Sequence, residues 1–140
     1  MTDKVLKIGI ITKEDYKQRT IAIAKGQYRP REDEPKVWFE SLRSMAQVLS
    51  SENQELLQVI LEQNPESIRE LEEYTGRRSS NLSRTLKTMA RYGIIELRKT
   101  NRAVKPVVIA TDFRVEFALR GRFRRAPSES GAEAEKAKAT

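Results

Sequence analysis

Residues 66–98 read ESIRELEEYTGRRSSNLSRTLKTMARYGIIELR, and this stretch decides the fold because it carries start and stop signals for two consecutive helices. Ser67 and Glu70 have the spacing of a capping box, in which each side chain accepts from a free backbone N–H at the helix start. Gly76 and Gly93 suit the left-handed position that commonly follows a helix. The stretch therefore predicts a short helix, a turn of about three residues and a second helix ending before Gly93.

The second of these helices, expected from Ser79 or Ser80 to Tyr92, has two chemically different faces. Apolar side chains recur at helical spacing along one side and are Leu82, Leu86 and Met89. Basic and polar side chains lie along the other side and are Arg84, Lys87, Thr88 and Arg91. The pattern predicts that one face packs on a core while the other meets solvent or a partner.

A β-hairpin is expected directly after this helix. Ile94–Arg98 predicts a strand, Lys99–Arg102 a polar turn, and Val104–Phe117 a longer returning strand with a polar break near Asp112. Helix, glycine turn, helix and hairpin is the order of elements in a winged helix-turn-helix.

The preceding residues add two helices and an N-terminal arm. Helices are expected over Ser41–Ser50 and over Ser51–Gln63, the latter capped by Ser51 and Gln54. The arm should contain a strand over Val5–Ile11, a helix capped by Thr12 and closed by Gly26, a charged proline-containing linker over 27–36, and a brief strand or lead-in over Lys36–Glu40.

The expected fold class is mainly α with a small β-wing (α+β). A strand-helix arm and linker occupy residues 1–40, the winged helix-turn-helix occupies 41–118, and a basic, then low-complexity and disordered tail occupies 119–140.

Positive charge is concentrated in one segment of the chain. The 140 residues carry a formal net charge of +7, yet residues 77–105 alone hold nine Lys and Arg against the single acid Glu96. Clustering of this kind is typical of a surface that binds a polyanion such as DNA. The predicted DNA-binding residues are Arg77, Arg78, Ser79, Ser80, Asn81, Arg84, Lys87, Thr88, Arg91, Arg98, Lys99, Asn101, Arg102 and Lys105.

Within that set we expect different tasks. Ser80, Asn81 and Arg84, near the helix N-terminus, are candidates for base edges in the major groove. Ser79 and Ser80 also suit capping the helix or donating to a phosphate, beside Arg77 and Arg78. The hairpin tip should follow the backbone or enter the minor groove.

A second surface is expected on the N-terminal arm, whose apolar side chains exceed what a small strand-helix unit can bury. A homodimer or a protein partner would cover them. The predicted dimer or partner residues are Leu6, Ile8, Ile10, Ile23, Trp38 and Phe39.

Several function classes are excluded by composition. The sequence has no cysteine and no histidine, so thiol nucleophiles, zinc fingers and histidine acid–base catalysis are excluded. Adjacent acids such as Glu72 and Glu73 do not converge on one site, and no phosphate loop or metal motif occurs. We therefore expect no enzyme, no metal and no cofactor. With no signal peptide and no membrane-spanning run, we expect a cytoplasmic protein.

Residues 80–95, SNLSRTLKTMARYGII, resemble the recognition helix of MarR/ArsR-type winged-helix regulators. The chain has no long terminal dimerisation helices, so the dimer mode and ligand pocket of MarR proteins are not carried over. The segments RTIAIAKGQYRP, EPKVWFESLRSMAQVLS, TGRRSSNLSRTLKTMARYGI and ATDFRVEF resemble more closely small bacterial and archaeal TumA-like antitoxins, which are encoded beside TumE-type toxins. That resemblance implies a nucleoid-bound repressor of its own operon that also binds a cognate toxin.

The sequence thus predicts a sequence-specific regulator of double-stranded DNA, acting as a dimeric repressor on an inverted repeat. Two alternatives stay open. The chain could be a nonspecific nucleic-acid-binding or chromatin-associated protein that uses RGRFRR at 120–125, or a winged-helix protein-interaction module without DNA affinity.

Overall fold

The computed structural model describes residues 4–119 and contains a mixture of helices and small sheets. The elements in chain order are β1 (Val5–Ile10), α1 (Lys13–Ala24), β2 (Val37–Phe39), α2 (Leu42–Val48), α3 (Ser51–Gln63), α4 (Ile68–Thr75), α5 (Ser79–Arg91), β3 (Ile95–Thr100), β4 (Ala103–Val108) and β5 (Asp112–Glu116). The mixed α and β class expected from the sequence is confirmed. The tail beyond Leu119 lies outside the described residues.

Helices α3, α4 and α5 enclose the main hydrophobic core. Leu71 of α4 and Leu82, Leu86 and Met89 of α5 are fully buried, and Leu56, Leu57 and Ile60 of α3 pack against them. The predicted apolar stripe of α5 is therefore confirmed. Helix α4 begins where predicted, because Ser67 Oγ accepts from the Glu70 N–H, and it closes on Gly76 at a φ of 78°. The capping box is only half formed, since the Glu70 carboxylate accepts from the Glu66 N–H at 3.1 Å and not from Ser67.

Two helix starts differ from the prediction. Helix α3 is capped one residue earlier, by Ser50, whose side chain accepts from the Asn53 N–H. Helix α5 has Arg78 at its N-cap position and no side-chain cap there, so neither Ser79 nor Ser80 caps it. Ser79 is already inside the helix, and its hydroxyl is turned toward another partner, described below.

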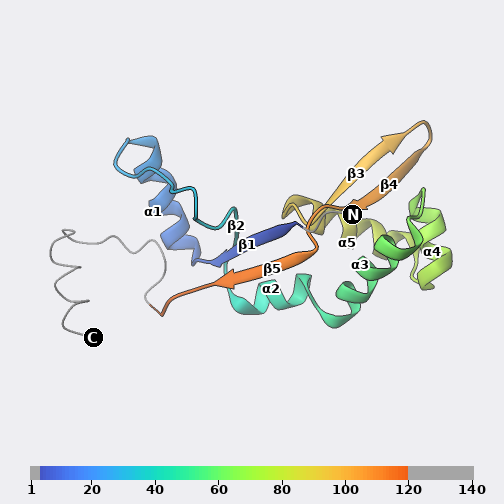
Figure 1. Cartoon of the computed structure of the whole chain (residues 1–140). Coiled ribbons are helices and arrows are strands. Elements are labelled where there is room, and N and C mark those ends of the chain that lie inside the picture. Colours follow the sequence, from blue (N-terminus) through green and yellow to red (C-terminus); the bar gives the residue numbers. More distant parts are fainter. Residues whose placement is uncertain (1–3, 120–140) are drawn as a thin grey trace.

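Strands β3 and β4 form the expected hairpin, with a shorter turn than predicted. They pair antiparallel from Ile95 opposite Val108 to Thr100 opposite Ala103, so only Asn101 and Arg102 remain in the turn. Asn101 adopts a positive φ of 40°, which asparagine tolerates better than most residues. Pairing therefore extends the hairpin farther from the helices, where Figure 1 shows it projecting beyond α5.

The predicted long return strand is instead two strands in two sheets. β4 ends at Val108, and β5 begins at Asp112 and joins a three-stranded parallel sheet of order β2-β1-β5. Val5 to Gly9 pair with Asp112 to Glu116, and β1 pairs on its other side with β2. The break occurs where Ile109 and Ala110 donate to Ile94 O before the chain turns away. The N-terminal arm is thus joined to the end of the hairpin unit by a shared sheet (Figure 1).

Close packing around β1 fixes the arm against this sheet. A Cβ added to Gly9 would lie 2.4 Å from the Trp38 ring, so only glycine fits opposite that side chain. Ile8 and Phe39 are almost completely buried, with exposed fractions of 0% and 1%. These two residues belong to the interior of the chain, which corrects their assignment to a partner surface.

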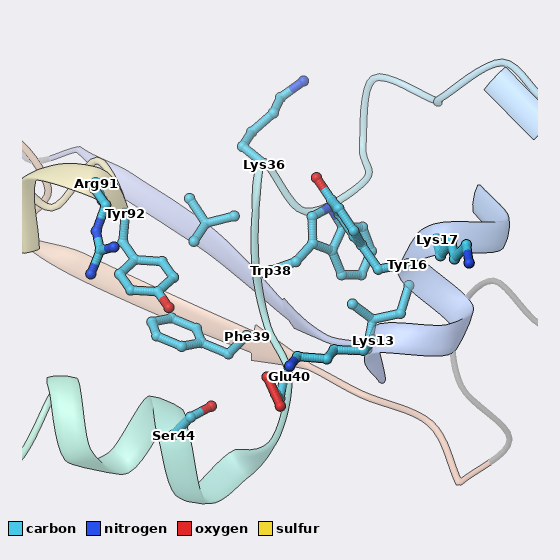
Figure 2. Close-up of a pocket in the computed structure, with 12 residues that line it drawn as sticks. Lys13, Tyr16, Lys17, Lys36, Trp38, Phe39, Glu40, Ser44, Arg91 and Tyr92 are labelled. Carbon is cyan, nitrogen blue, oxygen red and sulfur yellow. The ribbon is translucent and has the colours of Figure 1, made fainter. Parts of the chain in front are cut away.

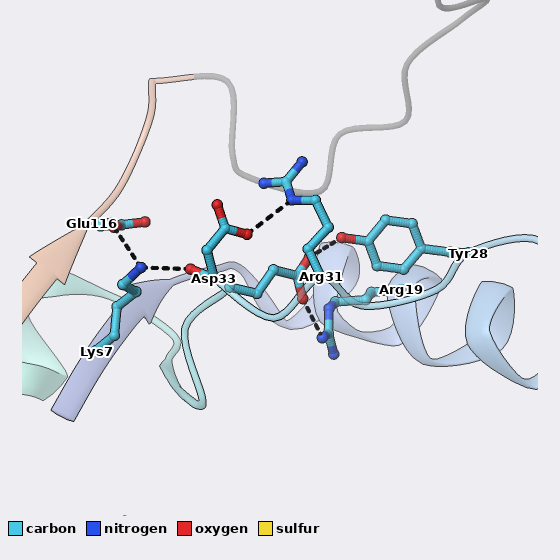
Figure 3. A network of polar contacts seen from close by, with 7 residues as sticks. Lys7, Arg19, Tyr28, Arg31, Asp33 and Glu116 are labelled. Carbon is cyan, nitrogen blue, oxygen red and sulfur yellow. Dashed lines mark hydrogen bonds and ion pairs between the residues drawn. The ribbon is translucent and has the colours of Figure 1, made fainter.

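Helix α1 and the 27–36 segment are connected by a partly buried polar network (Figure 3). Arg19 Nη2 lies 2.9 Å from Glu34 Oε1, and the Tyr28 hydroxyl donates to the other oxygen of Glu34. The Arg19 guanidinium also lies 5.2 Å from the centre of the Trp38 ring.

No helix within residues 4–119 combines the length and apolarity needed to cross a bilayer.

Candidate nucleic-acid interface

The outer face of α5 is a row of cationic side chains on a firmly anchored helix. Arg84, Lys87 and Arg91 are exposed, whereas the side chains behind them, Leu86 and Met89, have no exposed surface. The fully buried stripe fixes the rotation of the helix about its axis. The cationic row is consequently held in one orientation.

A groove of about 640 Å³ lies between this face and the hairpin. It is lined from α5 by Arg84, Lys87, Thr88, Ala90 and Arg91, and from β3 by Leu97. Ala90 and Leu97 were not among the predicted residues, because neither carries charge. Their contribution is a partly apolar floor beside the cationic row of α5.

The N-terminus of α5 holds a carboxylate of the same chain. Glu72 Oε2 accepts from the Ser79 backbone N–H at 3.1 Å, and Glu72 Oε1 accepts from the Ser79 hydroxyl at 3.0 Å. Glu72 thus satisfies the N–H and hydroxyl of Ser79, a residue predicted either to cap the helix or to donate to a phosphate, and the helix dipole favours the negative charge there. The sequence analysis assigned Glu72 no role, since its contact depends on how α4 crosses α5.

Two of the predicted basic residues have structural partners within the chain. Arg77 donates to Asn53 Oδ1 at 3.2 Å and to the Glu52 carbonyl at 2.8 Å, which ties the α4–α5 turn to the start of α3. Lys105 donates to Asn64 Oδ1 and Glu66 Oε2, both at 3.1 Å. These cations support the fold, and the charge of Lys105 is offset locally by the Glu66 carboxylate.

The hairpin carries three more of the predicted cations, Arg98, Lys99 and Arg102. Arg98 lies 2.5 Å from Glu96 Oε1, in a pair whose side chains are each more than half exposed. Lys99, Asn101 and Arg102 are exposed beyond it. An exposed ion pair of this kind contributes little and can reorganise when a polyanion approaches.

The other predicted residues lie around the start and middle of α5. Arg78, Ser80 and Asn81 are exposed in its first turn, and Thr88 is half-buried in the groove. The structure therefore places most of the predicted set on α5, on its N-cap and on β3 with the turn that follows it, namely Arg78, Ser80, Asn81, Arg84, Lys87, Thr88, Arg91, Arg98, Lys99, Asn101 and Arg102.

A second hollow adjoins the C-terminal end of α5 (Figure 2). It has a volume of about 460 Å³ and contains Arg91 and Tyr92 together with Trp38, Phe39 and Lys13. The rings of Phe39 and Tyr92 stack with their centroids 4.1 Å apart and an interplanar angle of 19°. This stack connects the end of α5 to the parallel sheet, so the predicted partner residue Phe39 acts as an internal contact.

The rest of the predicted partner set is half-buried. Leu6 packs against the main core, Trp38 lies under Arg19, and Ile10 and Ile23 are partly covered.

In the part of the chain that the structure describes, no group of three or more acidic side chains is arranged to hold a metal ion.

Comparison with known proteins gives one similarity. The model of the HVO_A0114 family matches residues 48–115, which run from the end of α2 through α3, α4, α5 and the hairpin into β5. No curated protein matches the chain, and no solved structure does. The matched region contains the main core and all of the cationic groove.

Proposed function

We propose that α3, α4, α5 and the β3–β4 hairpin constitute a winged helix-turn-helix, and that the protein is a sequence-specific transcriptional regulator of double-stranded DNA. The observation that carries the proposal is the division of α5 into a fully buried stripe and an exposed cationic row. A helix with this division can lie in a major groove about 12 Å wide while its inner side stays anchored.

Specific recognition falls to the first half of α5. Ser80, Asn81 and Arg84 are exposed on its first turns, where a helix entering the groove reaches base edges. Arginine pairs with guanine O6 and N7, and asparagine with adenine N6 and N7. The hairpin cations Lys99 and Arg102 contact the neighbouring backbone or minor groove, which positions the protein without selecting a sequence.

Control of transcription needs only occupancy. Two copies would place their α5 helices in successive major grooves about 34–36 Å apart, on an inverted repeat. When the protein is bound to a site that overlaps a promoter, RNA polymerase cannot reach that promoter. The protein acts as a dimeric repressor.

Selection of bound duplexes from a random pool tests this proposal. We expect an enriched site with two-fold symmetry, and we expect Arg84→Ala to weaken the preference at one base pair of each half-site. Binding without enrichment would indicate a nonspecific nucleic-acid-binding protein. Absence of binding at low salt would indicate a protein-interaction module instead.

A further inference from the structure

The outer edge of β5 is an unpaired strand edge within the described residues. β5 borders the sheet on the side of β1 opposite β2 (Figure 1). The Asp112 N–H donates to Lys4 O, toward β1. Since backbone groups alternate along a strand, those of Phe113, Val115 and Phe117 point away from β1. Val115 and Phe117 are also 40% and 53% exposed, which is high for apolar side chains.

The sequence along this edge is self-complementary. Residues 113–117 read FRVEF, which is symmetric about Val115 in its apolar residues and opposite in charge at the two positions beside it. A second copy running antiparallel, with Val115 opposite Val115, places Arg114 opposite Glu116 and Phe113 opposite Phe117. The ion pair and the aromatic pair each occur twice because of the two-fold axis.

We propose that the protein forms a homodimer by antiparallel pairing of two β5 edges, centred on Val115, which gives one continuous six-stranded sheet. This inference deepens the proposed function by naming the surface that joins the two copies. It takes from that function only the need for two copies, and it is tested without DNA.

Other two-fold registers are less favourable. Centring the pair on Arg114 brings two arginines together and sets Asp112 against Glu116. Centring it on Glu116 opposes two carboxylates. Centring it on Phe113 leaves Phe117 outside the paired strands. Like charges directly opposite each other destabilise a sheet, which disfavours the Arg114 and Glu116 registers. The Phe113 register sets Arg114 opposite Asp112 but leaves the exposed Phe117 unpaired, so the Val115 register is selected.

An apolar groove beside β5 supplies a place for the second copy's aromatic ring. It has a volume of about 350 Å³, and its walls include Leu49, Leu57 and Leu61 together with Phe113 and Val115 of β5. Phe117 of the second copy, opposite Phe113, lies on this same side of the sheet. Its ring would cover the groove and lose its own exposure.

The charged side of the strand is compatible with the pairing. Glu116 Oε2 lies 3.6 Å from Lys7 Nζ (Figure 3), and a carboxylate can accept from several donors at once. Arg114 forms no ion pair among residues 4–119 and is exposed. Arg114 of one copy can therefore reach Glu116 of the other without displacing Lys7.

The mass in solution of variants with reversed charges at positions 114 and 116 tests the interface. We expect a dimer for the native chain, and at least tenfold weaker dimerisation for Arg114→Glu and for Glu116→Arg alone. An equimolar mixture of these two variants should restore dimers, because every cross-strand pair is then opposite in charge. Arg43→Glu, the same charge change on an exposed position of α2, should leave the dimer intact.

A cysteine placed on the axis tests the register, since the native chain has none. Val115→Cys should form an intermolecular disulfide on mild oxidation, because directly opposed residues lie about 5.5 Å apart, whereas the exposed control Ile21→Cys should not. A monomeric native chain, or a dimer that ignores both charge reversals and does not cross-link at 115, would overturn the inference. DNA affinity, measured separately, reports on the proposed function and not on this interface.

Discussion

Glu72 and Ser79 are joined by two hydrogen bonds, one from the backbone N–H of Ser79 and one from its hydroxyl. The carboxylate therefore stands at the start of α5, where a helix in a groove approaches the DNA backbone. It stabilises the helix and at the same time opposes a phosphate at that position. At this one side chain, a gain in the stability of the fold comes with a loss in affinity for DNA.

Replacing Glu72 with Gln should separate these two effects. The variant keeps the shape and the ability to accept from Ser79 but removes a negative charge from the interface, so affinity for any duplex should rise a few-fold. Stability should fall by about 0.5–1 kcal/mol through the weaker cap. Titration of a labelled duplex and urea unfolding measure the two quantities. Glu73→Gln, an exposed neighbour, should change stability less, and an equal gain in affinity there would argue against a specific role for Glu72.

Arg84 and Lys99 should respond differently to truncation. Arg84→Ala should cost about 1–3 kcal/mol on the selected site and reduce discrimination at one base pair, because a bidentate contact to guanine is lost. Lys99→Ala should weaken binding to all sequences alike. Competition titrations with selected and random duplexes distinguish them, and equal losses on both duplexes for Arg84→Ala would refute its base contact.

Salt dependence should report fewer contacts than the count of basic residues suggests. Nine basic residues lie between positions 77 and 105, but Arg77 and Lys105 are bound within the chain, which leaves seven. If about six of them neutralise phosphates, log K should fall against log salt with a slope near −5. Titrations across salt concentrations measure it. A flat dependence would contradict the cationic interface.

The pair of Arg19 and Glu34 should be the most sensitive polar contact in the arm. Glu34→Gln leaves the largely buried Arg19 without a counter-charge, which should lower the free energy of unfolding by about 3 kcal/mol. Asp33→Asn removes an exposed pair with Arg31 and should cost less than about 1 kcal/mol. Urea unfolding followed by the fluorescence of Trp38, the only tryptophan, compares the two. Similar costs for both variants would show that burial does not matter here.

Sequence signals predicted correctly the features that depend on residues close together in the chain. Ser67 and Gly76 mark the two ends of α4, and the repeat of Leu82, Leu86 and Met89 predicted which side of α5 is buried. The same repeat, by exclusion, identified the exposed cationic row. The DNA target and the antitoxin role implied by the resemblance stay predictions.

Pairing between distant segments left no such signal. β1 has the alternation of a strand, but nothing near it shows that its partner begins at Asp112. Ile8 and Phe39 looked like surplus apolar side chains because the sheet that buries them could not be foreseen. For the same reason Arg77 and Lys105 were counted as free, although their partners lie 24 and 39 to 41 positions away.

The bond between Lys4 and Thr111 spans 107 positions of sequence, and it has a consequence for synthesis. While the nascent chain leaves the ribosome, β1 can pair early with β2, but its other edge must wait for almost all of the described residues before β5 appears. The helical core and the hairpin can fold in the meantime, because their contacts join residues closer in sequence. Until β5 has been synthesised, that edge of β1 is open to chaperones or to mispairing.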